Sequence, residues 1–456
     1  TAVATGTITG DAAELTTMAI TGAGTVAVTN LHATVNADLS NITATTHTAT
    51  ASTDFSFSGQ LGTANVILLD GVDMTVTAGE AKGNTFTGTA GGNAETILVT
   101  LANANAADKN ADLTTITLAT EATLASVTVT DSLTFTGTLH GATVTSVADS
   151  AVLSLVAAKA HDKTIDKSGT TGKVIADATV DAGLTLAGSA HHDVTNLISA
   201  LDASAVTGNL AVTLAADTAS SVVVGGTGTN TIDGDLLTNG QTLTITGDKA
   251  VSVSLVAGDV DASAVTVSAV TVTATTGSNI IQTGAGDDTI DAGGAVDNIT
   301  GGAGQDTITG GAGADIFVYA SGDSILGTIT ERASSGADII TDFASESDII
   351  DYAATLAIGG NHTTAGAARA QITEASGLAV FHTDDDTFAE RLVAVAASLN
   401  EGVTDGHSAM FTDGTETYVY IIDATAGNTT GDTLIHLDEF AGATMAFDSG
   451  NLTIGT

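Results

Sequence analysis

A nine-residue repeat between residues 274 and 318 constrains the fold of this chain more than any other feature. The segment divides in phase into ATTGSNIIQ, TGAGDDTID, AGGAVDNIT, GGAGQDTIT and GGAGADIFV. Glycine loses more conformational freedom on folding than any other residue, so glycine-rich turns at a fixed period need a stabilising partner. A cation bound by the repeated acids would be such a partner.

The repeat assigns a separate role to each of its positions. The glycines permit tight turns and leave backbone carbonyls unshielded, the sixth position supplies a hard oxygen, and the eighth position points into a core. The sixth-position residues are Asn279, Asp288, Asp297, Asp306 and Asp315. The eighth-position residues are Ile281, Ile290, Ile299, Ile308 and Phe317.

The composition favours a core built from thin layers of small side chains, and it argues against nucleic acid and membrane partners. The chain has 456 residues, of which aromatic residues make up only 3%, which favours a solenoid over a globule. Its 52 acidic residues against 10 Lys and Arg give a net charge of −42, so we expect no nucleic acid partner and no membrane insertion. Disorder is the alternative for an acidic chain, but abundant Val, Ile and Thr argue against it. Without cysteine, disulfides and thiolate metal sites are impossible.

Internal similarity extends beyond the nine-residue blocks. A duplicated unit of about 75 residues is indicated by three matching pairs, namely 36–43 with 110–117, 57–66 with 135–144, and 74–86 with 153–165. The segment LDASAVT at 201–207 recurs as VDASAVT at 260–266. Between these blocks, Thr, Val and Ala alternate with the period of two that predicts short strands. Proline is absent, as suits stacked strands, and the one good helix candidate is 386–402, with apolar Phe388, Leu392, Val395 and Leu399 and a stop at Gly402.

The nine-residue array resembles the RTX calcium-binding repeat. The alternative is a plain glycine-turn solenoid whose acids are merely solvated. In the RTX family two nonapeptides form one turn of a parallel β-roll, so acids 18 residues apart face each other across calcium. The resemblance implies the pairs Asn279 with Asp297, Asp288 with Asp306, and Asp297 with Asp315. Carbonyls of the turn glycines would complete the sites, namely Gly284, Gly286, Gly302, Gly304, Gly311 and Gly313.

Some positions depart from the repeat or only approximate it. Ala295 replaces the fourth-position glycine of the third block, which places the Asp297 turn in doubt. GGTGTNTID at 225–233 offers Asn230 as a weaker ligand, and Asn84 and Asn93 stand nine residues apart beside glycines. These are either structural turns or further calcium sites.

The C-terminal region adds to the resemblance. Residues 336–354 resemble the segment that follows RTX arrays, and 411–440 resemble the end of type I secreted RTX proteins, where the uncleaved C-terminus is the export signal. No N-terminal signal peptide is visible. Residues 190–456 as a whole look most like RTX-type surface-layer (S-layer) proteins of Gram-negative bacteria, which implies an extracellular, cell-surface location.

Catalytic motifs are weak, and we expect no enzyme. GHSAM around Ser408 lacks the second glycine of a nucleophile elbow, and SGDSILG at 321–327 has no α/β domain before it. HExxH does not occur. The cluster at 191–193 predicts a polar turn rather than a transition-metal site, and the acids at 384–386 predict a solvated helix start.

The sequence therefore predicts an all-β, elongated parallel β-solenoid, or calcium-binding β-roll, of short strands with a small C-terminal cap. Four regions are expected: 1–190, a Thr/Ala/Val-rich region with the duplication; 191–273, a solenoid with the DASAVT repeats; 274–320, the array; and 321–456, the cap and secretion signal. The expected function is structural, with several calcium ions ordering a chain that self-associates into an S-layer lattice or fibre. A cell-surface polysaccharide stays open as a partner, and an adhesin or biofilm matrix protein is the alternative function.

Overall fold

The computed structural model describes most of the chain as two compact units. The units comprise 1–195 with 202–210, and 196–201 with 211–456. The division falls within β18 (His191–Leu197), β19 (Ala200–Val206) and β20 (Leu210–Leu214). The described residues are 2–32, 37–102, 106–140, 145–179, 183–216, 220–225, 227–255, 257–325, 329–330, 333–334, 336–344, 347–354, 356–358, 370–372, 376–382, 385, 387–399, 406–423, 431–440, 444–448 and 451–455. The predicted division into four regions is finer and stays a prediction.

The first unit is a solenoid of short parallel strands. One sheet contains β1 (Ala2–Val3), β2 (Thr7–Asp11), β3 (Ile20–Leu31), β4 (Ile42–Ala51), β6 (Asn65–Leu68), β8 (Thr85–Gly88) and β10 (Thr117–Ala119). A second contains β5 (Phe55–Phe57), β7 (Met74–Thr77), β9 (Glu95–Leu101), β11 (Ala122–Val129), β13 (Thr145–Val147), β15 (Lys163–Lys167) and β17 (Leu184–Gly188). A third contains β12 (Leu133–Thr134), β14 (Val152–Val156), β16 (Lys173–Asp177) and β18. The one-turn helices are α1 (Ala12–Leu15), α2 (Ala78–Ala81), α3 (Ala106–Lys109), α4 (Ala157–Ala160) and the 3₁₀ turn η1 (Leu113–Thr115).

The two copies of the duplicated sequence form equivalent structures in this unit. Asp38 bridges to Gln60 in the first copy, and Asp112 bridges to Thr138 at the matching positions of the second. The helices α2 and α4 also begin and end at matching positions of the aligned segments.

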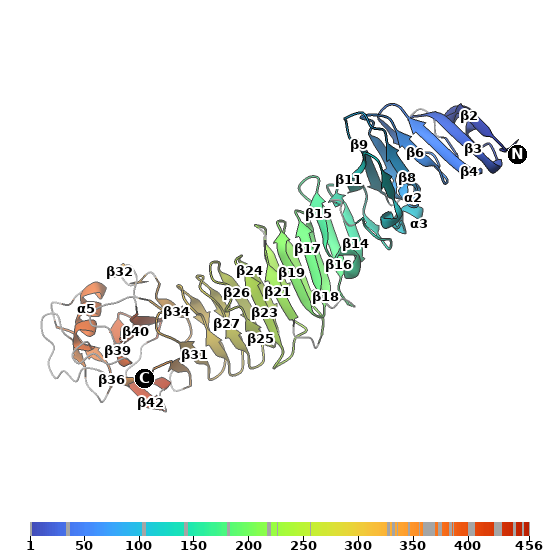
Figure 1. The fold of residues 1–456 in the computed structure, drawn as a ribbon. Helices are drawn as coiled ribbons and strands as arrows, with labels where there is room; N and C mark the ends of the chain where they lie inside the picture. Colours follow the sequence, from blue (N-terminus) through green and yellow to red (C-terminus); the bar gives the residue numbers. More distant parts are fainter. Residues whose placement is uncertain are drawn as a thin grey trace. The chain divides into compact units, whose positions relative to one another are not determined.

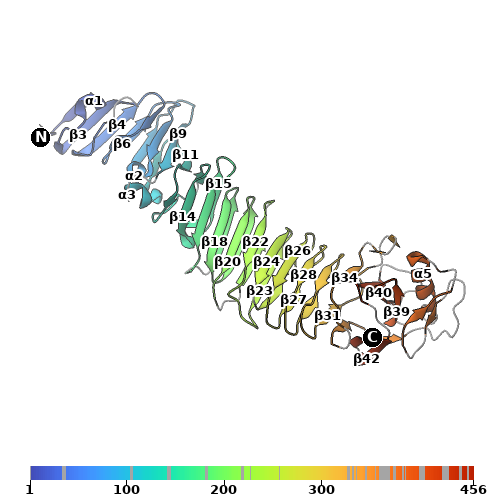
Figure 2. The same ribbon diagram turned by 180° about the vertical axis from the view of Figure 1, so that it is seen from behind.

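The second unit alternates its strands between two parallel sheets (Figures 1 and 2). One sheet contains β21 (Ser220–Val224), β23 (Thr242–Gly247), β25 (Asp259–Asp261), β27 (Ile280–Gln282), β29 (Asn298–Thr300), β31 (Ile316–Tyr319) and β35 (Ile349–Tyr352). The other contains β22 (Asn230–Asp233), β24 (Val251–Leu255), β26 (Val270–Ala274), β28 (Thr289–Asp291), β30 (Thr307–Thr309), β34 (Asp338–Ile340) and β41 (Thr433–Leu437). The expected parallel β-solenoid is thus confirmed.

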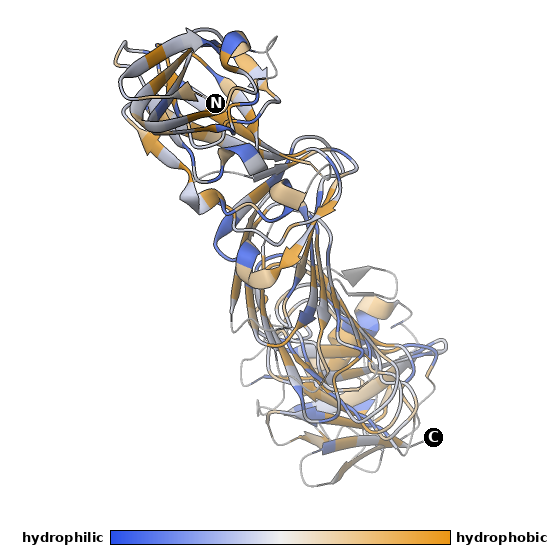
Figure 3. Cartoon of the chain, turned by 90° about the vertical axis from the view of Figure 1, so that its right-hand side faces the viewer, coloured by the Kyte–Doolittle hydropathy of each residue, from blue (hydrophilic) through white to orange (hydrophobic). Residues whose placement is uncertain are grey.

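Alternating burial builds the core of this unit. The strands carry both hydrophobic and hydrophilic residues (Figure 3), and burial alternates along β26, which buries Val270, Val272 and Ala274 on one face. The five eighth-position residues of the array are all buried, as predicted. Their side chains form the apolar layer between the two sheets.

A small cap follows the array. It contains β36 (Ala357–Ile358), β39 (His407–Asp413), β40 (Glu416–Ile421), β42 (Thr444–Asp448), β43 (Asn451–Gly455), the pairs β32 (Ile329–Thr330) with β33 (Ala333–Ser334) and β37 (Gln371–Ile372) with β38 (Ala379–Val380), and the helix α5 (Phe388–Leu399). The predicted helix is confirmed, and its four apolar residues are buried against β39 and β40. Gly402 lies outside the described residues. None of the helices in the described ranges has the length and hydropathy needed to span a membrane.

Candidate metal centre

Two rows of acidic or amide side chains run through the array. Each of the two sheets has one row, at the N-terminal ends of its strands. Residues one solenoid turn apart stack directly, because the paired positions are 18 residues apart. The first row contains Asp288, Asp306 and Asp338, which lie at the start of β28, β30 and β34. The second row contains Asn279, Asp297, Asp315 and Asp348, which precede β27, β29, β31 and β35.

Each acid in a row accepts a hydrogen bond from the residue one turn earlier. The N–H of Asp288 donates to Oδ1 of Asp306 at 2.8 Å, and the N–H of Asp297 donates to Oδ1 of Asp315 at 2.9 Å. The N–H of Asn279 donates in the same way to Asp297 at 2.8 Å. The structure thus brings together the residue pairs implied by the RTX resemblance, and a direct hydrogen bond joins the backbone of one to the carboxylate of the other.

The second oxygen of these carboxylates is buried and has no hydrogen-bond partner. This holds for Oδ2 of Asp288, Asp297, Asp306, Asp315 and Asp338. A buried polar atom without a partner is strongly destabilising, and an ionised one more so. The rows therefore present bare oxygens from adjacent turns, which is the donor chemistry that calcium prefers.

Burial shifts the titration of both rows in the same direction. In the protein without metal, loss of hydration raises the pKa of Asp288, Asp297, Asp306, Asp315, Asp338 and Asp348. For Asp297 the pKa is raised to about 7. Neighbouring acids raise it further, as Asp288 does for Asp306. A divalent cation would reverse both effects by supplying opposite charge.

The turn glycines are required because successive turns stack backbone against backbone. A Cβ added at Gly284, Gly286, Gly302, Gly304, Gly311 or Gly313 would lie closer than 3.0 Å to a backbone oxygen of the preceding turn. The φ angles of Gly302 and Gly311 are +88° and +92°, which side chains disfavour. The carbonyl of Gly284 also accepts a hydrogen bond from the N–H of Ala303 at 2.9 Å. These contacts stack each turn against the preceding one.

Ala295 keeps the glycine conformation of the turn that it interrupts. Its φ is +87°, and its N–H donates to the carbonyl of Ala312 at 2.7 Å. Asp297 remains in its row. The substitution therefore strains the turn without breaking it.

The rows continue past the repeat to two acids that sequence reasoning did not identify. The N–H of Asp306 donates to Oδ1 of Asp338 at 2.9 Å, and that of Asp315 donates to Oδ1 of Asp348 at 3.0 Å. The intervals are 32 and 33 residues instead of 18, which hid the period. The segments GADII at 336–340 and SDII at 347–350 resemble GADIF at 313–317 and could have revealed them.

Asn230 occupies the first row but is separated from its acids. Its register through β22, β24, β26 and β28 places Val251 and Val270 between Asn230 and Asp288. The Nδ2 atom of Asn230 donates to the carbonyl of Ala250 at 3.0 Å, and its Oδ1 is buried without a partner. The structure therefore does not bring Asn230 together with the array. Asn93 supports a turn by donating to Asp70.

The other clusters considered from sequence form structural contacts. Ser408 lies within β39 and donates to the carbonyl of Ala357, so no strand-to-helix elbow surrounds it. Ser324 is buried and donates to the carbonyl of Leu434. The prediction of a polar turn at 191–193 was wrong, because these residues begin β18. There His192 is buried, which lowers its pKa to about 4.

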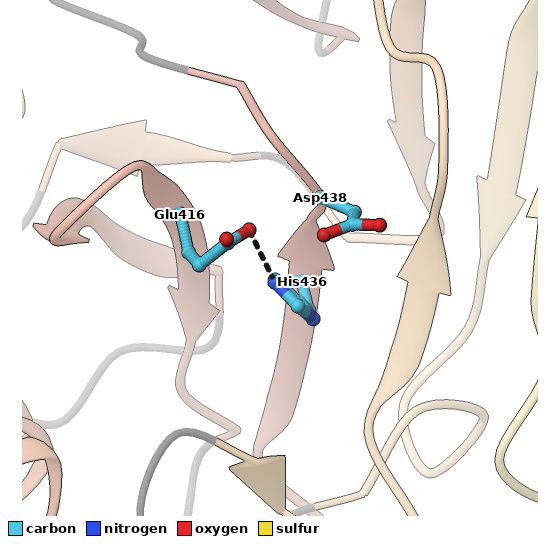
Figure 4. Close-up of side chains that lie close together, drawn as sticks. All are labelled: Glu416, His436 and Asp438. Carbon is cyan, nitrogen blue, oxygen red and sulfur yellow. Dashed lines mark hydrogen bonds and ion pairs between the residues drawn. The ribbon is translucent and has the colours of Figure 1, made fainter.

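Two further acidic groups lie in the cap. Of the acids at 384–386, only Asp385 lies within the described residues, and it is buried rather than solvated, with its Oδ2 accepting from the N–H of His382. Glu416, His436 and Asp438 offer ligand atoms within 4.8 Å of one another (Figure 4). Although burial opposes it, hydrogen bonds from the Glu439 N–H and from His436 hold the pKa of Glu416 at about 2. The three residues are half-buried, and Nε2 of His436 lies 3.0 Å from the carboxylate of Glu416.

Comparison with known families decides the nature of the array. The RTX calcium-binding nonapeptide repeat matches residues 271–297 and 291–326, in 4 copies. The chain carries an RTX repeat array. RTX repeats bind several calcium ions per array, and the bare oxygens of the acid rows fit that cation. No curated protein matches the chain. An RTX β-solenoid is a structural, calcium-binding fold rather than a typically catalytic one.

Proposed function

We propose that this chain is a structural cell-surface protein that folds and self-assembles on calcium binding into an extracellular S-layer lattice or fibre. The observation that carries the calcium dependence is the pair of buried rows whose carboxylate oxygens lack partners. Without metal these rows place like charges beside each other inside a chain of net charge −42. Binding of calcium to the folded state alone then makes folding depend on the calcium concentration.

The proposed ligands follow from the two rows and their turns. Carboxylates of adjacent turns would share an ion, and carbonyls of the turn glycines would complete its oxygen shell. The ligand set is Asn279, Asp288, Asp297, Asp306 and Asp315, with Gly284, Gly286, Gly302, Gly304, Gly311 and Gly313. To these the structure adds Asp338 and Asp348 as row members, and it leaves Asn230 apart.

Exposed apolar side chains beside the array support self-association. Val267, Ile280 and Val296 are 72%, 51% and 50% exposed. Large apolar side chains on the surface of a rigid solenoid are suitable contact points for a neighbouring copy once calcium has ordered the turns. Replacing all three with serine should weaken assembly while leaving calcium binding unchanged.

Secretion through the C-terminus is part of the proposal. RTX repeat proteins are typically secreted, and low cytosolic calcium would keep the array open during export. Deleting 411–456 should retain the chain inside the cell. Since β41 pairs with β34, this deletion also removes part of the cap. Fusing 411–456 to an unrelated carrier therefore separates export from folding, and a carrier that stays inside would contradict the signal.

Electron microscopy distinguishes the lattice from the alternative. Purified protein imaged in negative stain should show regular arrays or fibres with about millimolar calcium and none with EGTA. An adhesin or biofilm matrix protein would instead remain dispersed and bind a glycan or cell surface saturably. Dispersed particles at every calcium concentration, together with such binding, would favour the adhesin.

A further inference from the structure

Glu95 is a buried acid in the first unit, far in sequence from the array. It begins β9 and is 0% exposed. Along β9 it shares the buried face with Ile97, Val99 and Leu101. Neither oxygen of its carboxylate has a hydrogen-bond partner. A carboxylate in such surroundings is strongly destabilising unless a partner compensates for its lost hydration.

Within the described part of the chain, Glu95 shares this condition with the array alone. The carboxylates that have a buried oxygen without a hydrogen-bond partner are those of Glu95, Asp288, Asp297, Asp306, Asp315 and Asp338. The last five are all members of the rows that run through the calcium-binding array. Bare buried carboxylate oxygens therefore mark cation positions elsewhere in this molecule.

The sequence around Glu95 has the same order of parts as an array block. GGNAETI at 91–97 and GGAGQDTI at 301–308 each begin with two glycines and end with an acid, a threonine and a buried isoleucine, but the first lacks the third glycine of the array block. The turn before Glu95 is one residue shorter, whereas glutamate is one methylene longer than aspartate. Both acids are buried, although the turn lengths and side-chain lengths differ.

The surroundings of Glu95 leave its carboxylate available. The neighbouring N–H of Thr96 donates to Oδ1 of Asp73 at 3.1 Å, so it does not bind Glu95. A Cβ added at Gly88 would lie closer than 3.0 Å to Oε2 of Glu95 and to the N atom of Ala122. The carboxylate thus lies against the backbone of two adjoining turns. Glycine at position 88 leaves room for it.

We propose that Glu95 binds a calcium ion in the first unit. Both Oε atoms would be ligands, and backbone carbonyls of the adjoining turns would complete the shell. Carboxylate and carbonyl oxygens are the ligands that calcium prefers. This site lies outside the matched repeats and gives the first unit its own calcium dependence, separate from that of the array.

Hydrogen–deuterium exchange of the full-length protein tests the site in EGTA and in about 5 mM calcium. Peptides covering 95–101 report on Glu95, and peptides covering 281–317 report on the array. Calcium should slow exchange in 95–101 about tenfold in the unaltered protein. Glu95→Gln should lose this local response and keep that of the array. The exposed-acid control Asp131→Asn should keep both, and Asp306→Ala should keep the response of 95–101.

A second variant keeps the experiment informative if Glu95→Gln fails to fold. Glu95→Leu removes a buried charge, so in EGTA its β9 amides should exchange more slowly than those of the unaltered protein, with no further slowing in calcium. A calcium response of 95–101 that survives in Glu95→Gln would overturn the site. So would the absence of any such response in the unaltered protein while the array responds, because Glu95 would then hold no ion. Loss of the array response alone would instead contradict the proposed function.

Discussion

Aspartates of the DASAVT segments and of the array lie on solenoid strands or at strand ends. Their carboxylates differ in burial and in hydrogen-bond partners. Asp202 is exposed, and its Oδ1 accepts hydrogen bonds from the N–H and the hydroxyl of Ser204 at 3.0 and 2.6 Å. Asp306 is buried, accepts one N–H, and leaves Oδ2 without a partner. The first kind of turn is complete by itself. The second leaves one carboxylate oxygen without a partner, which we propose is a calcium ligand.

The two kinds of aspartate also differ in their pKa shifts and in the regularity of the turns that carry them. Hydrogen bonds from Ser204 lower the pKa of Asp202, whereas burial raises that of Asp297. Stacked acids in the array repeat every 18 residues, but turn lengths in the first unit vary, since Thr48 pairs with Asn65 and Thr85 pairs with Thr117. Ions shared between adjacent turns need a constant period. Turns closed by their own side chains tolerate insertions.

Removing an acid from one of the two rows should change the stability of the array at least as much as any other substitution proposed for this comparison. Asp306→Ala removes a ligand between two neighbours and should destabilise the calcium-loaded array by about 3 kcal/mol. Asp291→Ala, which removes an exposed acid from β28, should change stability by less than about 0.5 kcal/mol. Calcium titrations followed by exchange of 281–317 measure both variants. Equal calcium midpoints for the two would contradict the distinction between buried and exposed acids.

Filling a stacked glycine should have an effect of similar size. Gly311→Ala meets a backbone oxygen of the preceding turn and has a φ of +92°, so we expect a loss of about 3 kcal/mol. Gly240 has a φ of +82° but nothing within 4 Å of an added Cβ, so Gly240→Ala should cost only about 1 kcal/mol. Denaturant unfolding measures the difference, which isolates backbone stacking. Similar losses in both variants would remove the stacking argument.

Acidity should affect the two kinds of turn in opposite directions. In EGTA, the folded array holds protons that unfolded aspartates, with a pKa near 3.9, release. Because the pKa of Asp297 is raised to about 7, the stability of the metal-free array should fall as pH rises from about 4 to 7. The lowered pKa of Asp202 stabilises its turn above about pH 4, and this contribution is lost on further acidification. Hydrogen–deuterium exchange of each segment in EGTA at several pH values measures both trends. A change of stability in the same direction in both segments would contradict the prediction.

Relieving the strained array turn should give the smallest change. Ala295→Gly removes a side chain from a residue with a φ of +87° and should stabilise the loaded protein by about 1 kcal/mol. Ala303→Gly, in a turn where φ is not positive, should destabilise it by about 0.5 kcal/mol. Calorimetric melting in calcium measures the signs. A lower melting temperature for Ala295→Gly would show that the turn is unstrained.

The same contrast explains how far the sequence could be interpreted. The period of nine predicted the buried eighth positions and the stacking of acids 18 residues apart. It could do so because turns of constant length keep the same strand register from one turn to the next. Asp338 was missed because a longer connection precedes it, and Glu95 because a shorter turn carries a longer acid. Asn230 matched the pattern locally, but two valines separate it from the row. Residues 191–193 looked like a turn because they are polar, although His192 points inward within a strand.

A calcium titration of the full-length protein, followed by hydrogen–deuterium exchange of β27 to β31, tests the central claim most directly. We predict rapid exchange of these strands in EGTA, because the unpaired carboxylates oppose folding. Protection should appear at about 10⁻⁴ to 10⁻³ M calcium, the usual range of extracellular sites. Exchange in EGTA as slow as in millimolar calcium would show that the array folds without metal, and the account of the buried rows as calcium sites would then be wrong.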